Sequence, residues 1–485
     1  MLALVTLLLI PGYLLAVACY NLFLHPLRSF PGPPLAKVSK LWSRIGNRSG
    51  RKAERIHQAH LQYGPVVRFG PNELSIADPA AVRAIYMSDA FVKEETFYRA
   101  KTIFHEDHLF STRDVRAHRQ RRKLFARGYS QAAMMEYEPN ISNKIDILLK
   151  QWKARSADGP IDVYPWLHWF AFDVVYHLMF DDDPGQVASG QSHEVIAYLA
   201  AWKPTYIYKK EFFPQLDRWG VYVPGYVGDY FRQVQEWKKY SVNLIKRSRE
   251  RGTKTPFLRA VLNGDEDAFL GRPLTNSELA EECMAGMFAG SGTTANTFLF
   301  LLWACLRRPD IVDRLKAELR EAFPDPSIIP DYRTCSSLPY LQAVISETLR
   351  RYPVAISQLP RTAVKDTVVA GVVIRKGTTV GTQNYTTHFN EEAFPNPLEF
   401  RPERWLEKEN ETSRKEAWTP FSIGSRKCIG INLAQMELSK LVATFFRRFD
   451  GTVDDSIDDD AMRMYDTFTA SPAGGKLLVH LCESL

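Results

Sequence analysis

Closely spaced cysteine pairs are missing from this sequence of 485 residues. The six cysteines lie at positions 19, 283, 305, 335, 428 and 482, and no two of them form a Cys-x-x-Cys pair. Zinc fingers and redox-active dithiols need such close spacing, and disulfide scaffolds are short chains that are dense in cysteine. The cysteine pattern therefore excludes a metal finger and argues against a disulfide scaffold.

The sequence also lacks a large excess of charge of one sign, internal repeats and low-complexity tracts. Charged residues make up 24% of the chain, hydrophobic residues 45%, and the formal net charge is +7. This composition is typical of a globular protein with a large core, and it gives no indication of a nucleic-acid partner. One large catalytic domain and two fused domains both fit this length.

Charged side chains are absent from residues 1–24, which are mostly aliphatic or aromatic. A helix of this length can span about 30 Å of hydrocarbon. Residues 16–18 (Ala-Val-Ala) leave a cleaved signal peptide as an alternative, although no basic region precedes the apolar stretch. Basic residues follow it instead, so the positive-inside tendency predicts an N-terminal transmembrane anchor with the remaining chain in the cytosol.

A proline-rich stretch follows the predicted anchor. Residues 25–40 contain His25-Pro26 and the run Phe-Pro-Gly-Pro-Pro. Prolines fix φ angles and remove backbone donors, which predicts a stiff hinge that orients a domain relative to the membrane. We expect residues 41–485 to form the catalytic domain.

The remaining pattern predicts a mainly α domain with a minor β-sheet region. Strand-like runs at residues 66–69 and 73–77 flank a Gly-Pro-Asn turn. Residues 116–350 have mostly helical periodicity, whereas residues 367–382 resemble two strands around Arg-Lys-Gly at 375–377.

The longest predicted helix covers residues 276–308 and begins with a capping box of Thr275 and Glu278. Its middle contains Gly290 and Gly292, each of which costs about 1 kcal/mol relative to alanine. Sequences often break a local rule of this kind at functional sites. Close helix packing through small residues is the alternative interpretation.

One cysteine lies in surroundings that favour a metal ligand. Residues 421–430 read Phe-Ser-Ile-Gly-Ser-Arg-Lys-Cys-Ile-Gly and precede a predicted helix. The N-terminus of that helix, free backbone donors and Arg426 are expected to hold Cys428 as a thiolate. A thiolate is the iron ligand that favours cleavage of the O–O bond.

This segment matches F-x-x-G-x-R-x-C-x-G at every defined position, and the chain resembles the cytochrome P450 superfamily. Three further motifs occur in the family's order: a long helix with A-G-x-[DE]-T-T, an E-x-x-R helix and a P-E-R-W segment. The resemblance spans nearly the whole chain and is most similar to filamentous-fungal members of secondary metabolism. It implies the cytochrome P450 fold and haem b (iron protoporphyrin IX) as cofactor.

The resemblance implies that Cys428 is the axial ligand of the haem iron. Three other residues of its loop are implied to bind the cofactor: Phe421, Gly424 and Gly430. A buried charged triad is implied to support the loop, and its members are Glu347, Arg350 and Arg404. Buried charges of this kind are stable only when paired, so Glu347→Ala is expected to lose haem through misfolding.

Haem propionates need cationic partners. The family draws them from a W-x-x-x-R helix, from an arginine after the E-x-x-R helix and from the cysteine loop. His118 and Arg122 have the first spacing, with histidine in place of tryptophan. Arg361 and Arg426 are implied to be the other two partners.

Three neighbouring basic residues, Arg119, Arg121 and Lys123, have two interpretations. They form a solvated face, or they dock an acidic flavoprotein reductase, because the same helix faces the electron donor in the family. High salt is expected to weaken such docking. The resemblance implies an NADPH-dependent reductase as partner and leaves cytochrome b5 open as a further donor.

The long helix departs from the family pattern at Gly292, where the family has an acidic residue, whereas Thr293 aligns with the family's proton-relay threonine. Protons would then come from ordered water through Thr293 and either Thr294 or Ser291, or from a substrate hydroxyl. Monooxygenation is the favoured activity. A haem-dependent isomerase or lyase that needs no NADPH, and a non-catalytic haem sensor, remain as alternatives.

The implied substrate is an apolar polycyclic, terpenoid or aromatic molecule, and the implied location is the endoplasmic reticulum membrane. Four segments are implied to line its pocket: residues 103–110, the long helix around Phe288, residues 354–359 and residues 466–470. The aromatic-rich stretch 206–230 is either a lid on the bilayer or a packed loop.

Overall fold

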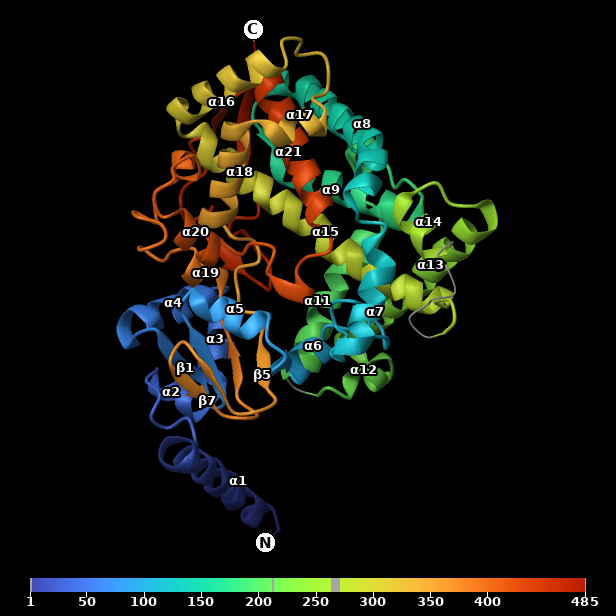
Figure 1. The fold of residues 1–485 in the computed structure, drawn as a ribbon. Helices are drawn as coiled ribbons and strands as arrows, with labels where there is room; N and C mark the ends of the chain where they lie inside the picture. Colours follow the sequence, from blue (N-terminus) through green and yellow to red (C-terminus); the bar gives the residue numbers. More distant parts are fainter. Residues whose placement is uncertain (1, 212, 263–270, 485) are drawn as a thin grey trace.

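The computed structural model describes residues 2–211, 213–262 and 271–484, and for residues 2–10 it describes the backbone alone. Helices form the large upper body in Figure 1, and a smaller sheet region lies below them. Helix α1 projects from the lower end, whereas the C-terminus lies at the top. The prediction of a mainly α fold with a minor β-sheet region is confirmed.

The first half of the helices runs from the N-terminal projection to the right-hand side of the body in Figure 1. These helices are α1 (Leu2–Cys19), the π-helix η1 (Tyr20–Leu24), α2 (Pro34–Val38), α3 (Leu41–Arg48), α4 (Lys52–Tyr63), α5 (Ala80–Tyr86), α6 (Glu95–Arg99), α7 (Val115–Ala126), α8 (Gln131–Arg155), η2 (Ser156–Asp158), α9 (Val163–Phe180), α10 (Gln186–Ser189), α11 (Val195–Glu211), α12 (Leu216–Trp219), η3 (Gly220–Tyr222), α13 (Gly225–Arg251) and α14 (Pro256–Leu262).

The second half contains the helices that carry the sequence motifs. They are α15 (Asn276–Leu306), α16 (Pro309–Ala322), α17 (Tyr332–Ser337), α18 (Pro339–Arg351), α19 (Asn384–Thr387), η4 (Pro402–Trp405), α20 (Glu411–Ala417), η5 (Gly424–Arg426) and α21 (Ile431–Arg448). Helices α15, α18 and α21 contact one another in the centre of the body.

The strands form one larger sheet and three small ones in the described residues. The larger sheet has the order β1-β2-β8-β5-β3, the second has β4-β12-β9, and the other two are the pairs β10-β11 and β6-β7. Their bounds are β1 (Val66–Gly70), β2 (Glu73–Ile76), β3 (Phe91–Lys93), β4 (Ile161–Asp162), β5 (Arg361–Ala363), β6 (Thr367–Val369), β7 (Val372–Ile374), β8 (Thr379–Gly381), β9 (Phe449–Val453), β10 (Met464–Asp466), β11 (Ala470–Pro472) and β12 (Leu478–Glu483).

The predicted hairpin of β1 and β2 is confirmed as an antiparallel pair. The predicted strands on either side of residues 375–377 are present as β7 and β8, and residues 367–382 contain β6 as a third strand that was not predicted. Strands β6 and β7 pair across a two-residue loop of Ala370 and Gly371, with φ angles of 48° and 75°. Positive φ at both central residues makes the tight turn whose twist suits a hairpin, so the chain turns between β6 and β7. Strand β8 then joins β2 and β5 instead.

Helix α15 confirms the predicted long helix and its capping box, and it ends at Leu306. Its C-terminal half is buried among aromatic and aliphatic side chains of the main core. It packs most extensively against α9. A Cβ atom at Gly290 would lie 2.9 Å from Val175 of α9, whereas one at Gly292 would meet nothing within 4 Å. The close-packing interpretation therefore holds for Gly290 and does not account for Gly292.

The segment that follows α1 is attached to the sheet region. Leu27 is buried in the cluster beneath the larger sheet. The Arg68 guanidinium on β1 donates hydrogen bonds to the carbonyls of Asn21 and Leu27, at 2.9 and 3.3 Å. In the part of the chain that the structure describes, no helix combines the length and apolarity that are needed to cross a bilayer.

Candidate active site

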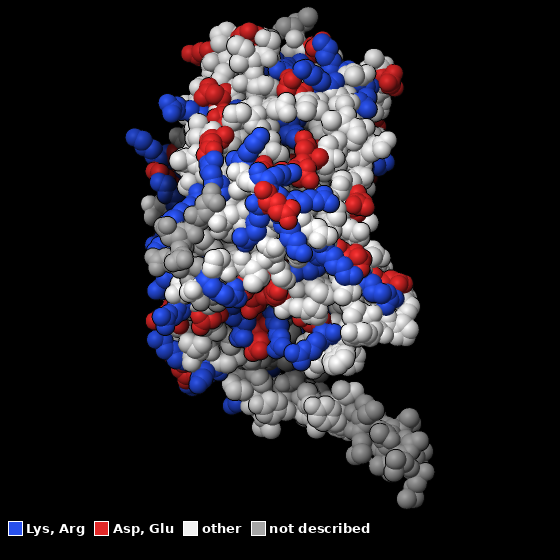
Figure 2. All heavy atoms as spheres, turned by 90° about the vertical axis from the view of Figure 1, so that its right-hand side faces the viewer, with Lys and Arg blue, Asp and Glu red and all other residues white. Residues whose placement is uncertain are grey.

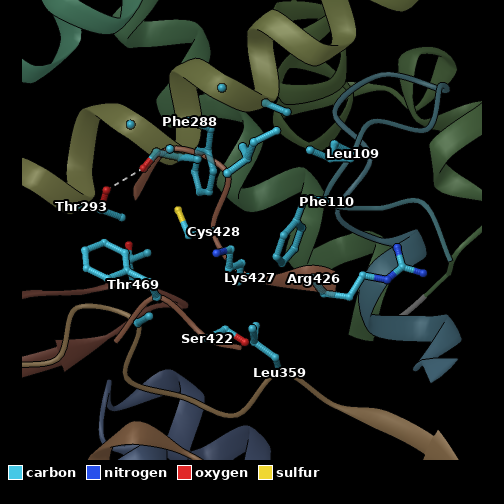
Figure 3. Close-up of a pocket in the computed structure, with 18 of the residues that line it drawn as sticks. Leu109, Phe110, Phe288, Thr293, Leu359, Ser422, Arg426, Lys427, Cys428 and Thr469 are labelled. Atoms are coloured by element: carbon cyan, nitrogen blue, oxygen red, sulfur yellow. Dashed lines mark hydrogen bonds between the residues drawn. The ribbon is translucent and has the colours of Figure 1, made fainter. Parts of the chain in front are cut away.

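A cavity of about 370 Å³ lies where α15 meets the cysteine loop and the segments before α7. In Figure 3 the Cys428 sulfur points into this cavity toward α15, and Phe110, Phe288 and Thr469 lie around it. All of the predicted site residues except Gly424 and the charged triad line the cavity: His118, Arg122, Thr293, Thr294, Arg361, Phe421, Arg426, Cys428 and Gly430.

The cysteine loop has a fixed backbone. The Cys428 N–H donates to the Phe421 carbonyl at 2.9 Å, and α21 begins at Ile431, directly after Gly430. Gly424 does not line the cavity. Its φ is +72°, and a Cβ atom there would lie 2.8 Å from the Tyr86 carbonyl oxygen, so the loop can lie against α5 only with glycine at this position.

Opposing effects act on the charge of Cys428. The Cys428 side chain is accessible from the cavity, and its removal from bulk water raises the pKa of the thiol above the usual value. The Gly430 N–H and Arg122 act in the opposite direction and lower the pKa. Without a metal the surroundings favour the thiol. A bound metal ion deprotonates a coordinating thiol, so this raised pKa is compatible with ligation.

Cations gather on one side of the cavity. Burial and the neighbouring Arg361 lower the pKa of Arg426 to about 10. Burial lowers the pKa of His118 to about 2, and Lys93, Arg426, Arg122 and Arg361 contribute to this shift. These groups repel one another, and an anionic group placed among them would relieve the repulsion. The cavity wall therefore fits the propionates of a haem.

The predicted triad residues are in contact and fully enclosed. Arg350 makes a two-pronged hydrogen bond to the Glu347 carboxylate at 2.9 and 2.7 Å, and Arg404 Nε lies 3.2 Å from the same group. Arg350 also donates to the His388 carbonyl at 3.1 Å, and His388 Nε2 accepts from the Thr419 N–H at 3.0 Å. These hydrogen bonds connect α18 to the segment that precedes the cysteine loop.

The interpretation of Arg121 as a surface residue was wrong. Arg121 is buried and its guanidinium lies 3.0 Å from the Glu282 carboxylate of α15. Burial raises the pKa of Glu282 to about 7, whereas Arg121 and the Leu109 N–H lower it. The pair joins α7 to α15 beside the cavity. Arg119 and Lys123 are exposed.

The hydroxyl residues of α15 have different partners. Thr293 donates to the Ala289 carbonyl at 2.8 Å, which is the dashed line in Figure 3. Thr294 is buried and donates to the Glu437 carboxylate of α21 at 2.8 Å. Burial raises the pKa of Glu437 to about 8, so this carboxyl group holds a proton at neutral pH. Sequence reasoning missed Glu437, because nothing in the sequence places α21 beside α15.

The four predicted pocket segments all contribute to the cavity lining. Sequence reasoning missed Val175 of α9, Trp202 of α11 and Lys101. The walls consist mostly of apolar groups, with aromatic rings prominent among them: Tyr98, Phe110, Phe125, Trp202, Phe288 and Phe468.

Comparison with known proteins shows which family the chain is similar to. A sequence model of the cytochrome P450 family matches residues 31–479. The benzoate 4-monooxygenase of Aspergillus niger is 30% identical over 460 residues, which cover 87% of each chain. The averantin hydroxylase of Dothistroma septosporum is 31% identical over 444 residues, which cover 91% of this chain and 83% of the relative.

A solved structure shows the same fold. The crystal structure of the cytochrome P450DA haem domain aligns with a TM-score of 0.81 at 19% identity, covering 94% of this chain and 98% of that chain. The chain therefore belongs to the cytochrome P450 family and is a haem-thiolate monooxygenase.

Proposed function

We propose that this monooxygenase is membrane-bound and oxidises a mainly apolar small molecule in secondary metabolite biosynthesis. It uses O₂ and two electrons derived from NADPH. The observation that carries this proposal is the Cys428 sulfur, which faces a cavity with apolar walls and the hydroxyl residues of α15. One fungal relative is named as a benzoate 4-monooxygenase, and benzoate is an aromatic compound.

In this proposal Cys428 is the axial ligand, with Phe421, Gly424 and Gly430 shaping its loop. Four residues hold the propionates: His118, Arg122, Arg361 and Arg426. When bound, haem supplies the activation of dioxygen. The chain orients the substrate and excludes water, and the triad of Glu347, Arg350 and Arg404 holds the loop in place.

Protons are delivered from the α15 side without an acidic residue at Gly292. Thr293 keeps acceptor lone pairs toward the cavity while its hydrogen is donated to Ala289. Thr294 connects the same wall to Glu437, a carboxyl group that is protonated at neutral pH because it is buried. A proton donor on α21 thus compensates for the glycine on α15.

The electron donor docks on α7. Four basic residues of this helix and its C-terminal end are exposed and make no ion pair among the described residues: Arg116, Arg119, Lys123 and Arg127. On the side of the molecule that Figure 2 shows, basic and acidic side chains are intermingled. Unpaired cations beside the cysteine loop suit an acidic NADPH-dependent flavoprotein reductase, and cytochrome b5 is compatible with the same surface.

The membrane-facing end lies where α1 projects. The lid interpretation is supported by four aromatic residues near the α11–α13 connection, which are 61–76% exposed: Phe213, Trp219, Tyr222 and Tyr226. Arg44 of α3 forms an ion pair with Glu211 of α11 at 2.8 Å. Because this pair holds α3 beside α11, the exposed Leu41 and Ile45 of α3 lie at the same end of the molecule as these aromatic residues. We infer that residues 1–24 anchor the protein in the endoplasmic reticulum membrane and that residues 25–40 orient the cytosolic domain 41–485. The four exposed aromatic residues then enter the interface between the membrane and water.

The oxygenase proposal is tested with purified, haem-loaded protein, a fungal NADPH-dependent reductase and ¹⁸O₂. We expect a product of an aromatic probe such as methyl 2-naphthoate to carry one ¹⁸O atom, and we expect formation of this product to require both NADPH and the reductase. Raising the salt concentration should slow the reaction, because docking on α7 is electrostatic. Conversion of the probe to an isomer without NADPH would instead support the isomerase or lyase alternative.

Membrane binding is tested by flotation with vesicles that contain anionic lipid. We expect the full chain to float, and a variant without residues 1–24 to float only in part, through the exposed aromatic residues. Replacing Trp219, Tyr222 and Tyr226 together with serine in the shortened variant should abolish the remainder. A shortened variant that floats as fully as the parent would contradict the anchor.

A further inference from the structure

Lys101 is a buried amine without a hydrogen-bond partner. It lies between α6 and α7, lines the cavity, and is 2% exposed. Among the described residues its Nζ atom has no acceptor. Two neighbouring buried lysines differ in this respect: Lys93 Nζ donates to three backbone carbonyls at 3.3, 2.6 and 3.1 Å, and Lys209 Nζ donates to the Thr102 carbonyl at 2.7 Å. A buried, unpaired ammonium is costly unless a ligand pairs with it.

Aromatic rings enclose this amine on two sides. The Lys101 Nζ atom lies 3.5 Å from the ring centroids of both Tyr206 and Phe468. The rings of Phe97 and Trp202 lie farther away, at 5.3 and 5.5 Å. Ring faces attract a cation but offer no strong acceptor for its N–H groups. The arrangement therefore holds the amine in position and leaves its hydrogen-bonding capacity available to a molecule in the cavity.

A series of aromatic side chains lies between Lys101 and Cys428. Phe468 is stacked on Phe288 of α15, with centroids 6.4 Å apart and an interplanar angle of 24°, and Trp202 contacts Phe288 at 4.3 Å. Phe288 points into the cavity above Cys428 in Figure 3. A flat molecule lying along these rings would have one end at Lys101 and the other toward Cys428.

Building on the proposed oxygenase function, we propose that Lys101 anchors the substrate through an acidic group, so that the natural substrate is an aromatic carboxylate. The carboxylate accepts hydrogen bonds from the Lys101 ammonium and supplies the acceptor that the protein lacks. Its ring system packs against Phe468 and Phe288. Binding at this end directs the far end of the ring system toward the site of oxidation.

Charged neighbours make this binding depend on pH. Burial lowers the pKa of Lys101 well below its usual value. Lys210 and Lys209 of α11 and Lys52 of α4 lower it further, whereas Asp466 of β10 raises it. A bound carboxylate stabilises the ammonium form, so binding takes up a proton wherever the free amine is neutral. The affinity for a carboxylate should therefore fall as the pH rises, and the affinity for a neutral ester should not.

The test compares 2-naphthoate with its methyl ester, which has nearly the same shape but no charge. Dissociation constants are measured on the haem-loaded full chain by equilibrium dialysis and by the shift of the Soret band. We expect the parent to bind the acid about 10- to 100-fold more tightly than the ester, the range for a buried charge-assisted hydrogen bond. Lys101→Met should abolish or reverse this preference, whereas Lys203→Met, an exposed lysine beside Trp202, should retain it.

Three results would overturn the proposal: a parent that binds the ester as tightly as the acid, a Lys101→Met variant that keeps the preference, or an acid affinity that does not change with pH. The pH series uses the parent alone, so it stands even if Lys101→Met folds poorly. Oxidation of the ester together with any of these results would leave the oxygenase function intact and reject only the carboxylate anchor.

Discussion

Replacing Cys428 with serine is expected to abolish the strongly red-shifted Soret band of the reduced, carbon monoxide-bound protein, and oxygenase activity with it. The red shift requires a thiolate ligand, and an alcohol does not provide comparable electron donation to the iron. Of the described cysteines, only Cys428 lines the cavity. Burial raises the pKa of its thiol, so the iron itself must stabilise the deprotonated form.

Cys482→Ser is the matched control, because Cys482 is exposed on β12 and outside the cavity. It should keep the band and the activity of the parent. Circular dichroism and haem content should be recorded for both variants, since Cys428→Ser is expected to fold and to retain part of its haem through the propionate contacts. Thiolate ligation would be refuted by an unchanged band in Cys428→Ser, or by the absence of the band from haem-loaded parent protein.

Features carried by contiguous residues were predictable from the sequence. The capping box of Thr275 and Glu278 specifies the start of α15, because both partners lie within one helical turn. The loop from Phe421 to Gly430 likewise contains its own closing hydrogen bond and the beginning of α21. Local patterns of this kind depend on backbone geometry, which the nearby residues determine.

Features that depend on distant partners were not predictable. Arg121 looked like one of several surface cations on a basic helix, and only its contact with Glu282 of α15 shows that it is buried. Glu437 and Lys101 gave no signal at all, because a carboxylate on an amphipathic helix and a lysine in a loop are ordinary in sequence. Their positions beside the cavity follow from the packing of α11, α15 and α21.

The two glycines of α15 show why one pattern supported two interpretations. Gly290 allows close contact with Val175, and Gly292 has open space where a Cβ atom would lie. Close packing therefore accounts for Gly290, whereas the open space gives no steric reason for a small residue at Gly292. A sequence pattern cannot separate the two glycines, because the neighbour that distinguishes them lies on α9.

Glu347→Ala is expected to lower the free energy of unfolding by about 3–5 kcal/mol and to abolish haem binding. The substitution leaves the buried guanidinium groups of Arg350 and Arg404 without their shared carboxylate. It also removes the acceptor for Trp405 Nε1, at 3.0 Å, and for the Arg401 N–H, at 2.9 Å. Arg350 would then no longer be held against His388, which positions Thr419 ahead of the cysteine loop.

Denaturant unfolding and the haem-to-protein ratio measure these effects. Glu347→Gln keeps the shape and part of the hydrogen bonding, so it should be less damaging than alanine but still clearly destabilised, because the missing charge is buried. Glu411→Ala is the control: its pair with Lys415 is exposed on α20 and should contribute nothing measurable. If Glu347→Ala unfolded at the same denaturant concentration as Glu411→Ala and retained its haem, the triad would not be what supports the cysteine loop.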